Sequence, residues 1–571
     1  MRIGIDVGGT NTDAVLMDSG PRADRVLAAV KAATTADVTS GIVAALDGLQ
    51  AQHAFDPAGV HAVMIGTTHF INALVEASRL APTAALRLGL PATASLPPMV
   101  DWPSRLVDAI AGRAYLAHGG HEFDGRQISP LDEGELRRHA ADMAAHGVRS
   151  VAVSSVFSPV NAEFELRAAE ILAEELGPEL PVSLSHEIGR VGLLERENAT
   201  IINAALRELA AHIVDALAGS VQGHGITAPL YLSQNDGTLM DVGYARRYPV
   251  ATFASGPTNS MRGAAVLSGL GSCAVVDVGG TTTDVGVLTG GFPREATVEV
   301  SVAGIRTNFR MPDVLSIGLG GGSLVRGTGS DLTVGPDSVG YRLTERALVF
   351  GGDTLTATDI AVAADRAAIG DPGRVAELPR ELIEAALERI ATKVADVVDR
   401  MRISADPLPV VAVGGGSVLL PDEFPGLGAV HRPEHFAVAN AIGAAIAQVG
   451  GEVDRVFAIE PGRRDAVVDQ ARQEAVDRAV VAGADPASVS IVDFDEVPIP
   501  YLPGNATRIR CKAVGDLRLE HGPEHGSEPA GAGRSIAERS TNGQATAEQA
   551  AAGRSANGRS TAGQSTAGWA R

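Results

Sequence analysis

The feature that most constrains this chain is a motif that occurs twice, each time between two apolar segments. The sequence DVGGTNTD at residues 6–13 returns as DVGGTTTD at residues 277–284. Each copy follows one apolar run and leads into another, which predicts two strands joined by a tight glycine turn. A single copy is also typical of an ordinary Gly-Gly hairpin, but two copies in the same setting favour a shared function.

The residues of this motif suit the binding of a nucleotide's phosphate chain. An aspartate at the end of a strand presents its carboxylate to Mg²⁺ or to the waters around it, because Mg²⁺ prefers oxygen ligands. Two glycines permit a turn whose backbone N–H groups face phosphate oxygens, and threonine hydroxyls add donors. The chain contains no GxxxxGK[ST] loop, so this device differs from a P-loop. We therefore predict one motif on each of two opposing lobes, with ATP and Mg²⁺ between them.

Strand and helix patterns alternate along the rest of the chain, which predicts α/β layers with parallel central strands. We expect strands at residues 26–33, 61–66, 148–157 and 409–413, and helices at residues 39–49, 198–221, 380–401 and 436–449. The strand at 409–413 runs into Gly414, Gly415 and Gly416, whose bare backbone allows close approach by a ribose or adenine. The predicted fold is α/β, with two actin-like (ribonuclease H-like) lobes around a nucleotide cleft.

Composition narrows the partners and the compartment. The formal net charge is -21 and no Lys/Arg-rich run is present, which argues against nucleic acid. The two cysteines, Cys273 and Cys511, form no metal-ligand pattern and fit a reducing compartment. The chain begins with a strand pattern rather than a leader, and we find no apolar run of about 18 residues. We expect a cytoplasmic protein with no membrane partner.

Length and local composition suggest four regions. We predict a first lobe at residues 1–190, a second lobe with the second phosphate loop and the adenosine loop at 191–460, and a small α/β segment at 461–520. Residues 521–571 are rich in Gly, Ser, Ala, Thr, Arg and Gln and poor in large apolar residues. Such a segment buries too little apolar surface to fold, so we predict a disordered tail.

Several further segments resemble the hydantoinase A/5-oxoprolinase family. They are GTTHFINAL (residues 66–74), GGHEFDGR (119–126), SHEIGRVGLLERENATIINAAL (185–206), QNDGTLM (234–240), ASGPTNSMRGAA (254–265), IGLGGGS (317–323) and VGPDSVG (334–340). Together with the two DVGGT motifs, their ordered spacing covers roughly residues 2–450, which makes the set more specific than any one motif.

The resemblance implies ATP-dependent opening of a cyclic amide such as a hydantoin, 5-oxoproline or a lactam. Transfer of the γ-phosphoryl group to the ring carbonyl oxygen would make its carbon a better target for water. The resemblance also implies a possible hydantoinase B-like subunit and an oligomeric assembly.

The family's roles fall on the matching residues of this sequence. Asp6 and Asp277 would hold Mg²⁺ through water, and Asp13 or Asp284 would orient the attacking group. The nucleotide-binding residues would be Gly8, Gly9, Thr10, Asn11, Gly279, Gly280, Thr281, Thr282, Gly414 and Gly415.

Weaker candidates for substrate contact are Thr67, Thr68 and Asn72, at the predicted start of a helix, and His121 and Glu122. A helix N-terminus is a natural anion site, although capping alone also explains the threonines. His118, His121, Glu122 and Asp124 include metal-ligand types, although a polar loop with glycine turns explains them more simply. At residues 195–197 (ERE) we expect a solvent-exposed, salt-bridged helix start.

Two other functions remain open at this point. A small-molecule kinase of the actin-like class would release a stable phosphorylated product. An ATP-driven reactivating factor, or chaperone, would act on a partner enzyme; the lack of a cysteine cluster argues against an iron-sulfur activator of that type.

Overall fold

The structure is a computed structural model of the whole chain. It describes residues 1–9, 11–18, 25–34, 38–296, 300–404, 406, 408–499 and 505–518. Met1–Leu519 forms one compact unit. The predicted disordered tail, residues 521–571, lies outside the described residues. The predicted boundaries near residues 190, 460 and 520 stay predictions.

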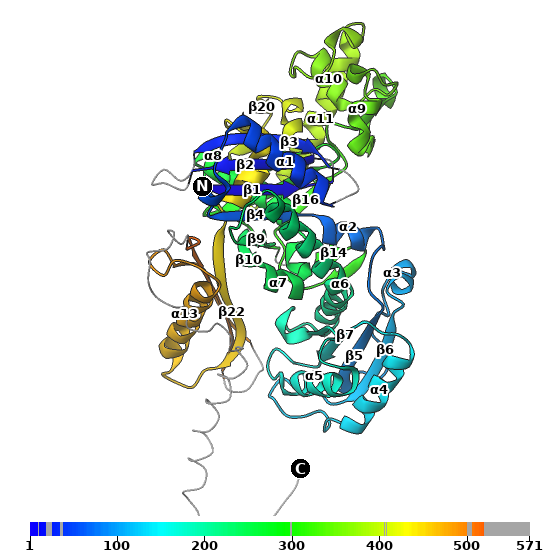
Figure 1. The fold of residues 1–571 in the computed structure, drawn as a ribbon, viewed down its shortest axis with the longest axis vertical. Helices are drawn as coiled ribbons and strands as arrows, with labels where there is room; N and C mark the ends of the chain where they lie inside the picture. Colours follow the sequence, from blue (N-terminus) through cyan, green and yellow to red (C-terminus); the bar gives the residue numbers. More distant parts are fainter. Residues whose placement is uncertain are drawn as a thin grey trace, which may run out of the picture. The chain divides into compact units, whose positions relative to one another are not determined.

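The first sheet has nine strands in the order β23-β24-β22-β10-β9-β4-β1-β2-β3 (Figure 1). Its strands are β1 (Arg2–Val7), β2 (Asn11–Met17), β3 (Val26–Ala33), β4 (Ala62–Thr67), β9 (Leu230–Ser233), β10 (Thr238–Asp241), β22 (Gln448–Ala458), β23 (Ser490–Pro498) and β24 (Ala506–Gly515). β1 pairs antiparallel with β2, which pairs antiparallel with β3, whereas β1, β4 and β9 are parallel. The five strands β3-β2-β1-β4-β9, numbered within this lobe, have the order 3-2-1-4-5, which is the ribonuclease H-like arrangement.

The second sheet repeats this arrangement around the second motif. Its strands are β11 (Cys273–Val278), β12 (Thr283–Thr289), β13 (Phe292–Pro293), β16 (Val314–Ile317), β19 (Val410–Val413), β20 (Glu423–Phe424) and β21 (Gly428–His431). β16, β12 and β11 pair antiparallel in turn, and β11, β19 and β21 are parallel. The predicted pair of actin-like lobes is therefore confirmed.

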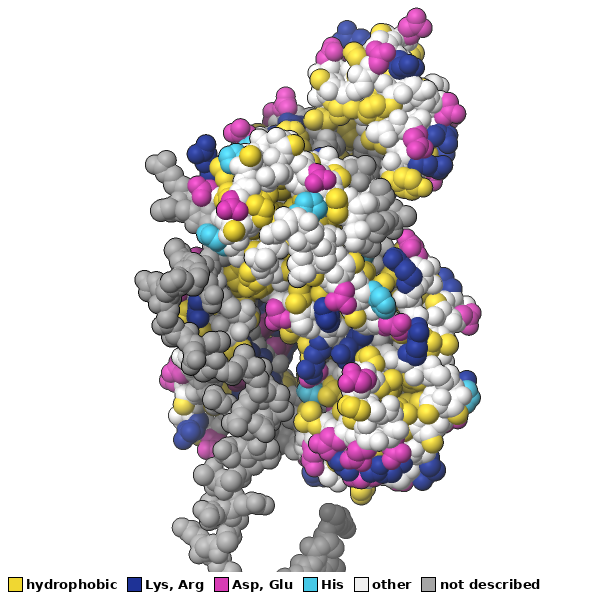
Figure 2. Space-filling model, viewed as in Figure 1, with side chains coloured by type: hydrophobic (Ala, Val, Ile, Leu, Met, Phe, Trp, Pro, Cys, Tyr) yellow, Lys and Arg dark blue, Asp and Glu magenta, His cyan; other side chains and the backbone are white. Residues whose placement is uncertain are grey.

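A third, four-stranded parallel sheet is inserted between β4 and β9. It has the order β6-β5-β7-β8 and consists of β5 (Thr83–Leu90), β6 (Arg113–His118), β7 (Ser150–Ser155) and β8 (Val182–Leu184). The helices α4 (Glu133–Ala145) and α5 (Glu163–Leu176) share a core with one face of this sheet. The long helix α6 (Leu193–Gly223) and the short α3 (Ser104–Ala109) contribute to the core on the other face. Acidic and basic side chains alternate over α4 and α5 at the lower right of Figure 2.

The remaining elements connect or cover the sheets. They are the helices α1 (Val38–Gln52), α2 (His69–Val75), α7 (Val242–Arg247), α8 (Ser255–Ser268), α9 (Leu343–Arg346), α10 (Ala357–Ala363), α11 (Arg380–Met401), α12 (Ala439–Ala445) and α13 (Arg464–Val481), and the short strands β14 (Val300–Val302), β15 (Ile305–Thr307), β17 (Ser323–Arg326) and β18 (Thr333–Ser338).

The helix expected at residues 436–449 is shorter than predicted. α12 ends at Ala445, and the chain enters β22 at Gln448. β22 pairs with β24 along ten residues and packs on α13. A Cβ on Gly451 would lie 2.2 Å from the backbone nitrogen of Ala479 in α13. Long-range pairing and this close packing therefore override the local helical pattern.

The helices α8 and α12 cross in close contact beside both sheets. α12 packs on β1, β2 and β4 of the first sheet, and α8 packs on β11, β12 and β19 of the second. A Cβ on Gly443 would lie 1.8 Å from the carbonyl oxygen of Asn259, and one on Gly263 would lie 1.9 Å from that of Ala439. Glycine at both positions thus allows the two backbones to touch.

Replacing Gly443 by alanine should destabilise the protein, because the added methyl group would overlap the backbone of α8. We expect a loss of about 1–3 kcal/mol in the free energy of unfolding, as for other overpacked cores. Denaturant titration followed by circular dichroism measures this loss.

Gly219→Ala is the matched control, since a Cβ at this helical position meets nothing within 4 Å. It should stabilise α6 by about 0.5–1 kcal/mol, because glycine in a helix costs that much relative to alanine. Equal stability of the two variants would contradict the close crossing.

Candidate active site

Both predicted motifs form hairpins with the same register. Asp6 lies opposite Asp13 across β1 and β2, and Asp277 lies opposite Asp284 across β11 and β12. One backbone hydrogen bond closes each turn. In the first hairpin the N–H of Gly8 donates to the carbonyl of Asn11 (3.0 Å), and in the second the N–H of Gly279 donates to the carbonyl of Thr282 (2.9 Å). Each hairpin therefore carries a facing pair of carboxylates just below a glycine turn. Thr10 lies outside the described residues.

The two hairpins line one cavity of about 730 Å³. The predicted residues on its wall are Asp6, Gly8, Gly9, Asn11, Asp13, Thr68, Asn72, Asp277, Gly279, Gly280, Thr281, Thr282, Asp284, Gly414 and Gly415. Residues almost 280 positions apart in the chain thus meet in one space, because each sheet presents the same edge to it.

Negative charge is concentrated in this cavity. The pKa of Asp6 is raised to about 6, mainly by burial. The carboxylates of Asp13 and Asp277 also act to raise this pKa, whereas the hydrogen bonds from Asn259 and Asn440 act to lower it. Burial likewise raises the pKa of Asp284 to about 6, and it raises that of Asp277. Carboxylates that lie this close together suit a divalent cation that keeps its own waters and is held through them.

Side chains from the crossing helices hold these carboxylates. Asn259 of α8 donates to Asp6 (3.2 Å), and the adjacent Ser260 donates to Asp277 (2.5 Å). Asn440 of α12 donates to both Asp6 (3.0 Å) and Asp13 (2.9 Å). The glycine-mediated crossing therefore fixes the aspartates of both hairpins.

These three residues were not predicted from the sequence. Asn259 and Ser260 belong to ASGPTNSMRGAA, which was noted only as part of the family resemblance. Asn440 stands in AVANAIGAA, where one amide interrupts a run of small apolar residues. A polar residue inside such a run was the available signal, since a buried amide needs partners.

The second aspartate of each hairpin, Asp13 or Asp284, has different neighbours in the two lobes. Lys31 of β3 forms an ion pair with Asp13 (2.5 Å) and lines the cavity. Asp284 instead accepts a hydrogen bond from Ser316. The two hairpins thus match in backbone geometry and differ in charge.

The second lobe gives the cavity an apolar side next to the glycine run. Gly414 has a φ of 80°, and a Cβ there would lie 2.2 Å from Oδ1 of Asp277, so glycine is required. The 3-10 helix Gly415–Leu419 follows directly. Tyr341, Leu343, Phe350, Ile369, Val418 and Leu419 also line the cavity. This combination suits a flat, partly apolar group such as a nucleoside base.

Three predicted substrate residues do not line the cavity. Thr67 is buried and its hydroxyl lies 2.6 Å from Nδ1 of His69, whose pKa burial lowers to about 4. His121 lies in the loop after β6 of the inserted sheet, which together with its helices we call the inserted domain. It is fully buried, and its ring centroid is 4.4 Å from that of Phe164. Glu122, beside it, is exposed. Among the described residues, no group of three or more His, Cys, Asp or Glu is arranged to hold a metal ion.

The expected exposed helix start at residues 195–197 is wrong in part. Arg196 and Glu197 are buried. Glu197 accepts two hydrogen bonds from Arg87 of β5 (2.7 and 2.5 Å) and one from Ser154 of β7 (2.6 Å). A buried charge needs such partners, and the insertion of a whole sheet against α6 supplies them.

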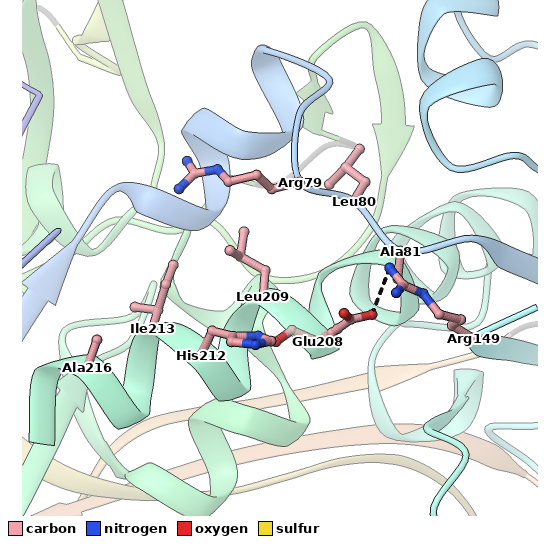
Figure 3. A pocket seen from close by; sticks show the side chains of 9 residues that line it. All are labelled: Arg79, Leu80, Ala81, Arg149, Glu208, Leu209, His212, Ile213 and Ala216. Carbon is pink, nitrogen blue, oxygen red and sulfur yellow. Dashed lines mark hydrogen bonds and ion pairs between the residues drawn. The ribbon is translucent and has the colours of Figure 1, made fainter. Parts of the chain in front are cut away.

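A second, smaller hollow lies over α6 (Figure 3). It measures about 450 Å³ and contains none of the predicted site residues. Its charged groups include Arg149 and Glu208, which form an ion pair at 3.1 Å. The duplicated motifs therefore single out the larger cavity.

Comparison with known proteins agrees with the fold and the motifs. The family "hydantoinase/oxoprolinase N-terminal region" matches residues 2–176, and "hydantoinase/oxoprolinase" matches residues 196–368. The chain belongs to the hydantoinase/oxoprolinase family.

Relatives in sequence include proteins of known and unknown activity. An uncharacterized protein of Methanocaldococcus jannaschii is 27% identical over 429 residues, which cover 70% of this chain and 62% of that protein. The caprolactamase subunit alpha of Pseudomonas jessenii is 27% identical over 424 residues, or 69% of this chain and 58% of the subunit. The acetophenone carboxylase gamma subunit of Aromatoleum aromaticum is 29% identical over 249 residues, or 42% of this chain and 34% of the subunit. The chain thus spans less than two thirds of these relatives.

Solved structures share the fold at low identity. The ATP-dependent caprolactamase of Pseudomonas jessenii has a TM-score of 0.72 at 19% identity and covers 93% of this chain and 90% of its own. Nucleotide-free acetone carboxylase has a TM-score of 0.66 at 19% identity, covering 92% and 89%. In the described part of the chain, no helix is long and apolar enough to cross a membrane.

Replacing Glu197 by glutamine should destabilise the inserted domain, because Arg87 would remain buried without its counter-charge. We expect a loss of about 3–5 kcal/mol. Trp102, whose ring N–H donates to the neighbouring Asn198 at 2.7 Å, is a local fluorescence probe for the denaturant titration.

Asp337→Asn is the matched control, because Asp337 pairs with Arg326 where both side chains are 61% exposed. Such a surface pair contributes about 0–1 kcal/mol. Similar losses of stability in the two variants would show that the buried Arg87–Glu197 pair contributes no more than an exposed ion pair.

Proposed function

We propose that the chain binds Mg-ATP in the large cavity and uses it to activate the carbonyl group of a cyclic amide for hydrolysis. The observation that carries this proposal is the pair of Asp-Gly hairpins, in identical register, on one cavity wall. The family supports it, because the relative named caprolactamase acts on a lactam.

Each part of the nucleotide has a matching part of the cavity. The phosphate chain would lie against the turns at Gly8–Asn11 and Gly279–Thr282, whose N–H groups suit phosphate oxygens. The base and ribose would lie beside Gly414 and Gly415, against the apolar side. Asp6 and Asp277 would hold Mg²⁺ through water, and the cation would neutralise charge on the phosphates.

The reaction needs the terminal phosphate to meet an amide oxygen. A bond forms between that phosphorus and the carbonyl oxygen of the ring, while the bond to the ADP oxygen breaks. The ring nitrogen gives up its proton as the imidate phosphate forms, and the imidate carbon is more electrophilic than the amide carbon. One water adds to it, the C–N bond breaks and the nitrogen leaves as a protonated amine, so that the carbon is left as an acyl phosphate. A second water then hydrolyses the acyl phosphate to a carboxylate and free phosphate. Asp13 or Asp284 would accept a proton from the water that adds to the ring carbon. Lys31, beside Asp13, would favour negative charge that develops on oxygen.

A second candidate is ATP-dependent carboxylation, in which the activated carbonyl belongs to a ketone. The fold similarity to acetone carboxylase and the sequence similarity to the acetophenone carboxylase gamma subunit favour it. The caprolactamase relative and the acetophenone carboxylase relative are each named as one subunit of an enzyme. We therefore infer that this chain also works with a partner subunit.

Substrate-dependent release of ADP and free phosphate tests the function. The purified chain with Mg-ATP would be assayed with hydantoin, N-methylhydantoin, 5-oxoproline, small lactams, and acetone with bicarbonate. Stimulation by a ring compound is expected, and Asp6→Ala and Asp277→Ala should each lower it by about 10²–10³-fold, as loss of one charge-stabilising group does.

Asp337→Asn serves as the folded control, because Asp337 is exposed and does not line the cavity. ADP formed while phosphate stays on the product would indicate a kinase instead. ATP turnover that responds only to a protein would indicate a reactivating factor. Full activity in either aspartate variant would refute the proposed site.

A further inference from the structure

One part of the cavity wall is built from α2 and the first turn of α8. Thr68, Ile71 and Asn72 come from α2 and its start, and Gly256 and Pro257 come from α8. β4 runs parallel to β1 with Thr67 level with Val7, so Thr68 emerges beside the first hairpin. The hydroxyl of Thr68 donates to the carbonyl of Val7 at 3.3 Å. A Cβ on Gly256 would lie 3.7 Å from Cγ2 of Thr68. We call these five residues the α2–α8 wall.

The α2–α8 wall has polar groups but no charge. Asn72 donates to the hydroxyl of Thr68 at 3.4 Å. Within the described part of the chain, this is the only hydrogen bond of the Asn72 side chain, which leaves its amide oxygen and second N–H for a ligand. An amide oxygen beside an N–H is the complement of a ring amide, which has one N–H and one carbonyl. Ile71 and Pro257 supply apolar contact area for ring methylene groups.

The charges around this wall oppose an anionic ligand. Asp6, Asp13, Asp277 and Asp284 all face the cavity, and a bound nucleotide would add more negative charge than its Mg²⁺ neutralises. Among the described residues on the cavity wall, Lys31 is the single cation, and Asp13 already pairs with it at 2.5 Å. A carboxylate on the ring would therefore lose water without gaining a free positive partner.

The N-terminus of α8 does not change this balance. It contributes only a fraction of a charge, and Pro257 removes one of its N–H donors. A partial positive charge of this kind suits the oxygen of a neutral carbonyl.

We propose that the ring accepted at the α2–α8 wall is electrically neutral, such as a simple lactam or an unsubstituted hydantoin, and that rings bearing a carboxylate, such as 5-oxoproline, are rejected. This inference rests on the proposed function and specifies its substrate class. Asn72 and Thr68 bind the ring amide, and Ile71 and Pro257 contact its carbon atoms.

The test compares ring compounds with and without a substituent that carries one carboxylate. The pairs are 2-pyrrolidinone with 5-oxoproline, and hydantoin with hydantoin-5-acetic acid. For each pair, kcat/KM for ADP release and the dissociation constant by calorimetry in the presence of Mg-ADP would be measured. We expect the neutral ring to be preferred by about tenfold or more in both quantities, because like charges in one site repel.

A variant that adds a cation gives a second, independent measurement. Ile71→Arg places a guanidinium on the α2–α8 wall, and should shift the ratio between 5-oxoproline and 2-pyrrolidinone by about tenfold or more toward the anion. Ile71→Met, of similar length and no charge, should keep the preference for the neutral ring. Circular dichroism and Mg-ADP affinity would verify that both variants fold.

The two readouts separate this inference from the proposed function. Ring binding with the neutral preference but without ADP release would remove the proposed reaction and keep the charge selectivity. Equal or tighter binding of 5-oxoproline, no binding of either ring, or an unchanged ratio in a folded Ile71→Arg variant would overturn the inference.

Discussion

The contact on which the rest of this structure depends is the crossing of α8 and α12 at Gly263 and Gly443. Any side chain at either position would meet the backbone of the other helix. Since α12 packs on the first sheet and α8 on the second, the short crossing distance sets how closely the two hairpins approach. Neighbouring residues of one helix, Asn259 and Ser260, can therefore bind Asp6 and Asp277 at the same time.

A repeated backbone has produced a site with two unlike halves. The register that sets Asp6 opposite Asp13 also sets Asp277 opposite Asp284. Yet Lys31 and Asn440 contact the first pair, whereas hydroxyl groups contact the second. A triphosphate is itself unsymmetrical, because one end carries the transferable group and the other the nucleoside. Unlike halves on a symmetric scaffold suit the nucleotide proposed to bind there, and Lys31 lies with the first hairpin.

The segment ERENAT (residues 195–200) stabilises the packing of the inserted sheet against α6. Glu197 and Arg196 join the inserted sheet to α6 through buried hydrogen bonds. Arg87 donates to Glu197, and Arg196 donates to the hydroxyl of Ser185 (2.9 Å). Asn198 links Trp102 to the carbonyl of Arg306. A buried network of this kind orients the inserted sheet relative to α6, because each charge would be costly without its partners.

The sequence by itself determined the two hairpins, the α/β class and several central strands of the two lobes, because these follow from local patterns: apolar runs, glycine turns and a repeated order of residues. Arg380–Met401 was predicted to the residue for the same reason, since its apolar stripe is regular. Tertiary structure alone decided which polar residues reach the aspartates. Asn440 lies over 400 positions from Asp6 in sequence and contacts it only because two glycines let helices touch. It also decided that residues 448–449 form a strand, that Thr67 turns to His69, and that Arg196 and Glu197 are buried. Such outcomes depend on contacts between distant segments, which no local pattern encodes.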